Sequence, residues 1–249
     1  MTETSANRLA STAHRGRDNN PIRLLLKGRA LFALIAIIIV FSVLSPNYFT
    51  VSNFLIMASH VAIYGILAIG MLLVILNGGI DLSVGSILAL CGVVAGALMQ
   101  GVTLQSLSVI LYLPVWAVVI VTCALGALIG GVNGVLIAWF RVPAFVTTLG
   151  VMYVARGIAL LMTNGLTYNN LSGSPDLGNT GFNWLGFNRL AGVPIGVVVL
   201  AVLAVLTGLM LSRSAFGRWL YASGGNENAA DLSGVPVKRV QITVYTVSG

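Results

Sequence analysis

One acidic residue stands inside the long apolar part of the sequence, within the segment NGGIDLSVG at residues 77–85. Gly78 and Gly79 permit backbone conformations that other residues resist. Asp81 and Ser83 carry oxygens that can accept the free N–H groups at the start of a helix. The segment therefore predicts either a capped helix start or a broken membrane helix that lines a polar pathway, and both readings stay open.

A second polar residue, Asn133, lies beside a regular series of glycines. Gly126, Gly130 and Gly134 recur every four residues, which places them on one helix face. Such a face lets membrane helices approach closely. We expect Asn133 either to form a hydrogen bond between helices or to contact a transported ligand.

Arg156 is a charged residue inside another apolar run. A charge within a membrane costs about 2.5–3.5 kcal/mol on insertion scales, so its side chain should face the protein interior or a wet cavity. Pairing with Asp176 and contact with a substrate are the two alternatives. The candidate pathway residues are Asn77, Asp81, Ser83, Asn133 and Arg156.

Several kinds of catalytic chemistry are absent from the sequence. Neither of the two lysines, Lys27 and Lys238, lies in a phosphate-binding loop of the form G-x-x-x-x-G-K-[ST]. There is no H-E-x-x-H motif, no G-x-S-x-G motif and no Cys/His cluster. We therefore predict no catalytic residue, no metal and no cofactor, and the chain is not expected to be an enzyme.

Composition restricts the class of protein. Of the 249 residues, 57% are hydrophobic and 8% are charged, with a mean hydropathy of +0.98. Soluble domains carry about 25% charged residues, so a soluble globular enzyme is excluded. The net charge of +7 is concentrated near the N-terminus and in residues 212–240, with no charge between Leu82 and Phe140. This distribution indicates membrane spans with positive cytoplasmic flanks rather than nucleic-acid binding.

The elements that position these residues are apolar runs of about 20 residues, the length a helix needs to cross a bilayer. We predict an all-α polytopic membrane protein with about six complete transmembrane helices and the start of a seventh. A signal peptide is the alternative for the first run, but no A-x-A-like site follows it. The predicted spans are residues 24–44, 54–76, 82–99, 113–140, 144–162 and 193–211, with the seventh beginning at Gln241.

The charge asymmetry predicts orientation. The tail at residues 1–22 and the loop at 212–240 both carry the positive excess, so both should be cytoplasmic, with an even number of spans between them. The loop at 163–191 should then lie outside. Because an apolar run continues to Gly249, we expect the transmembrane domain, residues 23–249, to be incomplete at its C-terminus.

The basic loop contains GGNENAADLSG, which predicts a short helix. Asn226 is a favourable N-cap, Glu227 suits the first turn, Gly234 suits the position after the last turn, and Pro236 prevents continuation. A helix this short is not stable alone in water. It is either an amphipathic turn on the membrane surface or a docking helix for another protein.

Three motifs together resemble the permease subunits of bacterial ABC sugar importers of the ribose, xylose and galactofuranose type. They are NGGIDLSVGSILAL at 77–90, PAFVTTLGVMYVARG at 143–157 and FGRWLYASGGNENAADLSGVPV at 216–237. The third is similar to the E-A-A-x-x-x-G loop of such permeases, with Asn228 where the pattern has Glu. The resemblance implies about ten spans per subunit, of which this chain covers the first two-thirds.

The resemblance also implies a function and partners. The chain would be the membrane-spanning subunit that moves a monosaccharide or related carbohydrate across the bacterial inner membrane, with its N-terminus in the cytoplasm. The expected partners are a cytoplasmic ABC ATPase, which hydrolyses the ATP, a periplasmic sugar-binding protein and a second permease subunit, identical or related. The residues assigned to ATPase coupling are Gly217, Gly224, Gly225, Asn226, Glu227, Asn228, Ala229, Ala230 and Gly234.

An ion-coupled secondary transporter of a small polar solute is the alternative function. Such proteins relay protons through buried carboxylates or histidines, and Asp81 and His60 are the candidates here. A requirement for ATP and a binding protein, rather than for a proton gradient, would separate the two functions.

Overall fold

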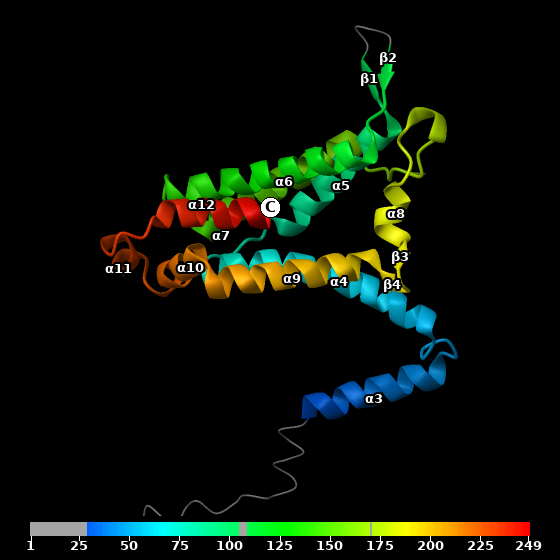
Figure 1. Cartoon of the computed structure of the whole chain (residues 1–249), viewed down its shortest axis with the longest axis horizontal. Helices are drawn as coiled ribbons and strands as arrows, with labels where there is room; N and C mark the ends of the chain where they lie inside the picture. Colours follow the sequence, from blue (N-terminus) through cyan, green and yellow to red (C-terminus); the bar gives the residue numbers. More distant parts are fainter. Residues whose placement is uncertain (1–28, 105–108, 170) are drawn as a thin grey trace, which may run out of the picture. The chain divides into compact units, whose positions relative to one another are not determined.

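The computed structural model describes residues 29–104, 109–169 and 171–249, and most of these residues are helical (Figure 1). The predicted tail at residues 1–22 and the beginning of the first predicted span lie outside the described residues. The chain divides into two units, Met1–Phe54 and Leu55–Gly249.

The first unit contains helix α3 (Arg29–Leu44) and the start of α4 (Val51–Leu76). The turn before α4 is held by local hydrogen bonds. The Asn53 side-chain amide donates to the Tyr48 carbonyl at 2.8 Å, and the Thr50 hydroxyl accepts the Asn53 backbone N–H at 3.3 Å. These bonds satisfy polar groups at the helix start, where the backbone has no internal partner.

The second unit is built mainly from apolar helices. After α4 come α5 (Val84–Gln100), α6 (Val115–Ala138), α7 (Ala144–Thr163), α9 (Ile195–Arg213) and α12 (Val237–Ser248). Of the described helices, α4, α6, α7 and α9 are long and apolar enough to cross a membrane, while α3 and α5 are apolar but shorter. The prediction of an all-α polytopic membrane protein is confirmed.

Several helix starts differ from the predictions by a few residues, and two of these differences have a local structural reason. Helix α5 begins at Val84 rather than Leu82, because the preceding residues form the turn of NGGID. Helix α12 begins at Val237, four residues before the predicted start of the seventh span at Gln241. Pro236 explains this earlier start, because its fixed φ suits the residue before a helix, and its carbonyl accepts the Val240 N–H at 3.1 Å.

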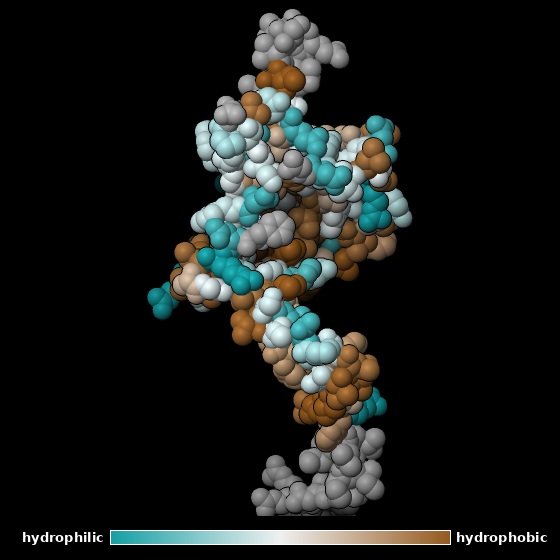
Figure 2. Space-filling model, turned by 90° about the vertical axis from the view of Figure 1, so that its right-hand side faces the viewer, coloured by the Kyte–Doolittle hydropathy of each residue, from teal (hydrophilic) through white to brown (hydrophobic). Residues whose placement is uncertain are grey.

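Short elements fill the connections at the end of the unit opposite α10 and α11. Strands β1 (Val102–Leu104) and β2 (Val109–Leu111) pair antiparallel, with Thr103 opposite Ile110. The predicted loop at 163–191 contains the 3₁₀ turn η1 (Pro175–Leu177) and helix α8 (Phe182–Phe187), then continues into β3 (Arg189–Leu190), which pairs with β4 (Val193–Pro194). Figure 2 views this end, where many hydrophilic and near-neutral residues gather between more hydrophobic flanks.

Helix α12 lies along the glycine face of α6 (Figure 1). A Cβ added to Gly134 would lie 2.7 Å from the Ile242 Cα, and one added to Gly130 would overlap the Tyr245 carbonyl. A Cβ on Gly126 would overlap the backbone of Gly249. The predicted close packing is confirmed, and its partner is the last helix of the chain.

The predicted loop at 212–240 is largely helical, which corrects the sequence interpretation. It contains α10 (Ala215–Gly225) and α11 (Glu227–Leu232) before α12 begins. Helix α10 escaped prediction because three of its eleven residues are glycine, which disfavours a helix. It forms because Ser214 caps its start, accepting the Gly217 N–H at 3.0 Å.

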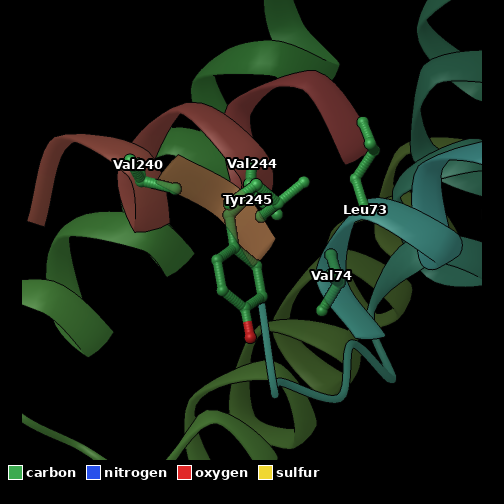
Figure 3. Packing of buried hydrophobic residues seen from close by; sticks show 6 residues of the cluster. Leu73, Val74, Val240, Val244 and Tyr245 are labelled. Atoms are coloured by element: carbon green, nitrogen blue, oxygen red, sulfur yellow. The ribbon is translucent and has the colours of Figure 1, made fainter. Parts of the chain in front are cut away.

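A hydrophobic cluster joins α4, α10 and α12 (Figure 3). The ring of Tyr245 points away from α12 toward the chain that connects α4 to α5 (Figure 3). Because α10 and α12 flank α11 in the sequence, the cluster anchors both ends of that short helix. The buried members are Leu73, Val74, Leu220, Val240, Val244 and Tyr245.

Candidate functional site

The turn between α4 and α5 begins with a glycine that closes α4. Gly78 has a φ of 80°, the left-handed conformation that glycine adopts without penalty. Its N–H donates to the Ile75 carbonyl and the Gly79 N–H donates to the Val74 carbonyl, both at 2.9 Å. These two bonds form the Schellman arrangement of a helix C-terminus. NGGID therefore ends one helix before the next begins.

Asp81 is buried in this turn, with 1% of its surface exposed. Its Oδ1 accepts the Ser83 backbone N–H at 2.8 Å and the Ser83 hydroxyl at 2.5 Å. The Asn133 amide on α6 donates to the same hydroxyl at 2.9 Å. Asp81, Ser83 and Asn133 thus form one hydrogen-bonded group, which we call the Asp81 cluster.

The Asp81 cluster is incompletely satisfied. Asp81 Oδ2 and Asn133 Oδ1 are buried and have no hydrogen-bond partner within the part of the chain that the structure describes. An unpaired polar atom costs about 1–3 kcal/mol when buried. The cluster can therefore accept further hydrogen bonds, from water or from a hydroxyl-bearing molecule.

The structure shows what Asp81 and Ser83 do at the start of α5. Asp81 accepts the N–H of Ser83, the residue that immediately precedes the helix, and Ser83 makes no side-chain cap bond. Thr148 on α7 holds the same turn by donating to the Ile80 carbonyl at 3.3 Å. The acidic side chain therefore orders the turn itself rather than capping the first turn of α5.

Asn77 lies apart from the Asp81 cluster. Its side-chain carbonyl accepts the Ser223 hydroxyl at 3.1 Å. A Cβ added to Gly224 would overlap the Leu76 carbonyl, so the end of α10 touches the end of α4 directly. Asn77 and Gly224 therefore join the proposed coupling segment to the helix that leads into NGGID.

Arg156 is also separate from the Asp81 cluster. Its side chain is exposed on α7 and lines a cavity of about 450 Å³, beside Ala89 and Gly92 of α5. The side chain of Asp176 lies outside the described part of the chain, so the predicted pairing stays a prediction. The structure thus brings together three of the five predicted pathway residues.

The predicted helix at 226–233 is present as α11. Asn226 caps it by accepting the Ala229 N–H at 3.0 Å, and Glu227 occupies its first turn. Gly234 ends it with a φ of 81°, and the N–H of Val235 donates to the Ala230 carbonyl at 3.0 Å. This is a second Schellman arrangement.

The other predicted coupling residues have distinct surroundings. A Cβ on Gly217 would overlap the Leu211 carbonyl, which brings α9 and α10 into backbone contact, whereas Gly225 has open space around it. Ala230 is the buried residue of α11. Asn228 and Ala229 are exposed on the same helix.

A cavity of about 470 Å³ lies between the turn after α4, the α6–α7 connection, α11 and α12. We call it the basal cavity. Tyr245, which sequence reasoning did not single out, lines it together with Gln241. Nothing in the local sequence marks Tyr245, because the turn that its hydroxyl approaches lies more than 160 residues earlier. The polar residues that line it are Asn77, Arg141, Glu227, Asn228, Asp231, Lys238, Gln241 and Tyr245.

Comparison with known proteins places the chain in a family. The family model described as "Branched-chain amino acid transport system / permease component" matches residues 53–249. The ribose import permease protein of Escherichia coli (strain K12) is 40% identical over 226 residues, covering 90% of this chain and 66% of the relative. No solved structure matches.

Two further relatives carry other names. The autoinducer 2 import system permease protein of Klebsiella pneumoniae is 37% identical over 92% of this chain and 62% of its own length. The fructose import permease protein of Bifidobacterium longum is 29% identical over 94% and 66%, respectively. The chain thus spans slightly less than two-thirds of the length of these relatives. Since the family model covers most of the sequence, including the Asp81 cluster and α11, this chain belongs to the family of transport-system permease components.

Proposed function

We propose that the chain is the membrane-spanning permease subunit of an ATP-driven importer that carries a monosaccharide or related carbohydrate into a bacterial cell. The observation that carries this proposal is the 40% identity to a ribose import permease over 90% of the chain. Relatives named for ribose, fructose and autoinducer 2 favour a small carbohydrate over an amino acid as cargo.

The proposal assigns α11 to the cytoplasmic ATPase. The helix is held at both ends, by the Asn226 cap and by Gly234, and Leu232 is 91% exposed on it. A helix whose two ends are both fixed offers a defined surface for docking to a protein partner. The ATPase would hydrolyse ATP, a periplasmic binding protein would deliver the sugar, and a second permease subunit would complete the pathway.

A movement of α11 would be transmitted to the Asp81 cluster through α12 and α6. Helix α12 follows α11 after a turn of four residues and packs into the glycine face of α6 with backbone contacts. Asn133 of the Asp81 cluster belongs to that part of α6. Since close backbone packing leaves no flexible side chain to absorb a displacement, α11, α12 and α6 would move together between two states.

The proposed orientation places the N-terminus and α11 in the cytoplasm and the loop at 163–191 outside. The concentration of Arg and Lys at the two ends of the span region supports it. In that orientation the basal cavity opens on the cytoplasmic side, next to the ATPase.

Uptake by reconstituted vesicles tests the function. The complete permease would be assembled with its ATPase and supplied with binding protein and radiolabelled ribose or fructose. We expect uptake to require both ATP and the binding protein and to be unaffected when the proton gradient is dissipated. Uptake that needs a gradient and no ATP would instead favour an ion-coupled transporter.

The ion-coupled alternative has one structural observation in its favour, the buried Asp81 carboxylate with an unpartnered oxygen. His60, its other candidate, is exposed on α4. A proton relay needs successive groups within hydrogen-bond reach, and Asp81 bonds only to Ser83 among the described residues. The alternative is therefore the less supported of the two.

A further inference from the structure

The rim of the basal cavity carries balanced charges. Arg141 and Lys238 are positive, and Glu227 and Asp231 are negative. Within the described residues none of these four side chains forms an ion pair or a hydrogen bond. The formal charges cancel, so the rim offers no net attraction to an anion or a cation. Each group stays available for charge-assisted hydrogen bonds to neutral hydroxyls.

The floor of the cavity carries unsatisfied hydrogen-bonding groups. Tyr245 is 1% exposed, and its hydroxyl has no partner among the described residues. The hydroxyl is directed at the turn after α4, so closely that a Cβ on Gly79 would overlap it (Figure 3). Gln241, 9% exposed, lies one turn earlier on α12 and makes no side-chain hydrogen bond within the described chain. Buried polar groups are normally paired, so the Tyr245 hydroxyl lacks a partner that a ligand can supply, and the Gln241 amide in the cavity lining offers further hydrogen bonds to the same ligand.

Size and chemistry together define the ligand. The volume of about 470 Å³ lies within the range of about 300–1,000 Å³ typical of small-molecule sites. We propose that the basal cavity binds a neutral polyhydroxy compound the size of a monosaccharide, with Tyr245 and Gln241 at its floor. The inference rests on the proposed function and deepens it: the cavity is an exit subsite for the carbohydrate, between the Asp81 cluster and α11.

Two other occupants are less well matched. A phosphorylated or carboxylated compound would require net positive charge, which the rim does not have. A side chain of the docked ATPase could reach the rim. It would not supply the several hydroxyls that can form hydrogen bonds with Tyr245 and Gln241 at the floor. Both occupants are outcomes of the following test.

The test measures protection of a cysteine on the rim. In the full-length permease with Cys91→Ala and Cys123→Ala, Asn228→Cys lines the cavity, and Leu232→Cys is the control on the same helix outside it. The rate of labelling by a membrane-impermeant maleimide is measured in the presence of ribose, xylose, fructose or ribose 5-phosphate. At a sugar concentration ten times its Kd, we expect Asn228→Cys to be labelled about tenfold more slowly, because only the unoccupied fraction reacts. Leu232→Cys should keep its rate.

Two floor variants sharpen the result. Gln241→Leu and Tyr245→Phe each remove one hydrogen-bonding group with little change in shape, and each should weaken protection by a neutral sugar about tenfold in concentration, the factor expected for loss of one buried hydrogen bond. Unchanged protection in both variants would overturn the assignment of the floor.

The remaining outcomes also decide between occupants. Stronger protection by ribose 5-phosphate than by ribose would overturn the neutral-ligand proposal. Protection of both cysteines by the ATPase, with none by any sugar, would assign the rim to protein docking instead. Absence of protection alongside normal vesicle uptake would refute the subsite and leave the proposed function intact. Protection by a sugar without vesicle uptake would support the subsite and refute the proposed function.

Discussion

A single carboxylate, Asp81, has a structural role in the turn after α4 and is the candidate for a functional one. Asp81 is fully buried, yet only its Oδ1 is hydrogen-bonded among the described residues. A residue that served only to hold the turn would do so with one oxygen, as asparagine can. The second oxygen has a desolvation cost that the turn does not require. We therefore propose that Asp81 belongs to the transport pathway as well as to the turn.

Replacing Asp81 by Asn tests this assignment. The amide oxygen can still accept from Ser83, so the protein should reach the membrane in near-normal amounts. Loss of a charge-assisted hydrogen bond is worth about 1.5–3 kcal/mol, so we expect uptake by vesicles to fall by about tenfold or more. Asp18→Asn, which removes a carboxylate from the N-terminal tail, is the control. Uptake at the wild-type rate would return Asp81 to a purely structural role.

At the scale of the helix, a glycine pattern in the sequence does not show which glycines are needed for close packing. On α6, Gly126, Gly130 and Gly134 are required by the backbone of α12. On α5, Gly92 belongs to a similar sequence pattern, but no described atom lies within 4 Å of an added Cβ. The pattern therefore predicts where two helices could approach, and only the packing shows where they do.

Replacing each glycine by alanine should give effects of opposite sign. Gly130→Ala places a methyl group on the Tyr245 carbonyl, and such overpacking costs about 1–3 kcal/mol. Gly92→Ala adds the methyl group in open space and should raise stability by about 0.5–1 kcal/mol, because alanine loses less entropy in a helix. Thermal unfolding of the two purified variants in detergent measures both. Equal stabilities would contradict the packing of α12 on α6.

Helix α11 depends on the conformation of one residue. Gly234 has a φ of 81° but no described atom near an added Cβ, so any penalty for substitution is conformational rather than steric crowding. In Gly234→Val the left-handed conformation would cost about 1–2 kcal/mol. The last turn of α11 and its exposed face would then shift, while the spans on either side keep their contacts.

We expect Gly234→Val to reach the membrane normally and to lose ATPase coupling. Co-purification of the ATPase and sugar-stimulated ATP hydrolysis measure the effect. Gly234→Asn is the matched control, because asparagine tolerates the left-handed region better than other residues, and it should retain most of the coupling. Undiminished association and hydrolysis in the valine variant would refute the docking role of α11.

At the scale of the whole molecule, the sequence predicted the helices better than their partners. Apolar runs and charge placement located the spans to within a few residues, because bilayer thickness and the cost of buried charge act on each run separately. Asp81, Ser83 and Asn133 were predicted and do lie together. Asn77 was grouped with them by proximity in sequence, but it bonds to Ser223, because the Schellman turn at Gly78 directs the chain away.

The features that escaped prediction depend on long-range packing. Tyr245 contributes to the basal cavity only because α12 returns to the glycine face of α6. Helix α10 packs against α4, α9 and α12, with Leu220 in the hydrophobic cluster that it shares with them. Its content of glycine and aromatic residues does not favour a helix in isolation. Neither feature has a local signature in the sequence.

Orientation in the membrane is a property of the whole molecule, and two cysteines suffice to measure it. Thr180 is exposed in the connection between α7 and α9, and Leu232 is exposed on α11, with the single span α9 between them. In the background without Cys91 and Cys123, we expect an impermeant maleimide to label Thr180→Cys in intact cells. Leu232→Cys should react only in inverted membrane vesicles. The physical reason is that Arg213, Arg218, Lys238 and Arg239 flank α11, and basic segments stay on the cytoplasmic side. Reaction of both cysteines from the same side would show that α9 does not cross the membrane, and reaction of each from the opposite side to that expected would invert the orientation.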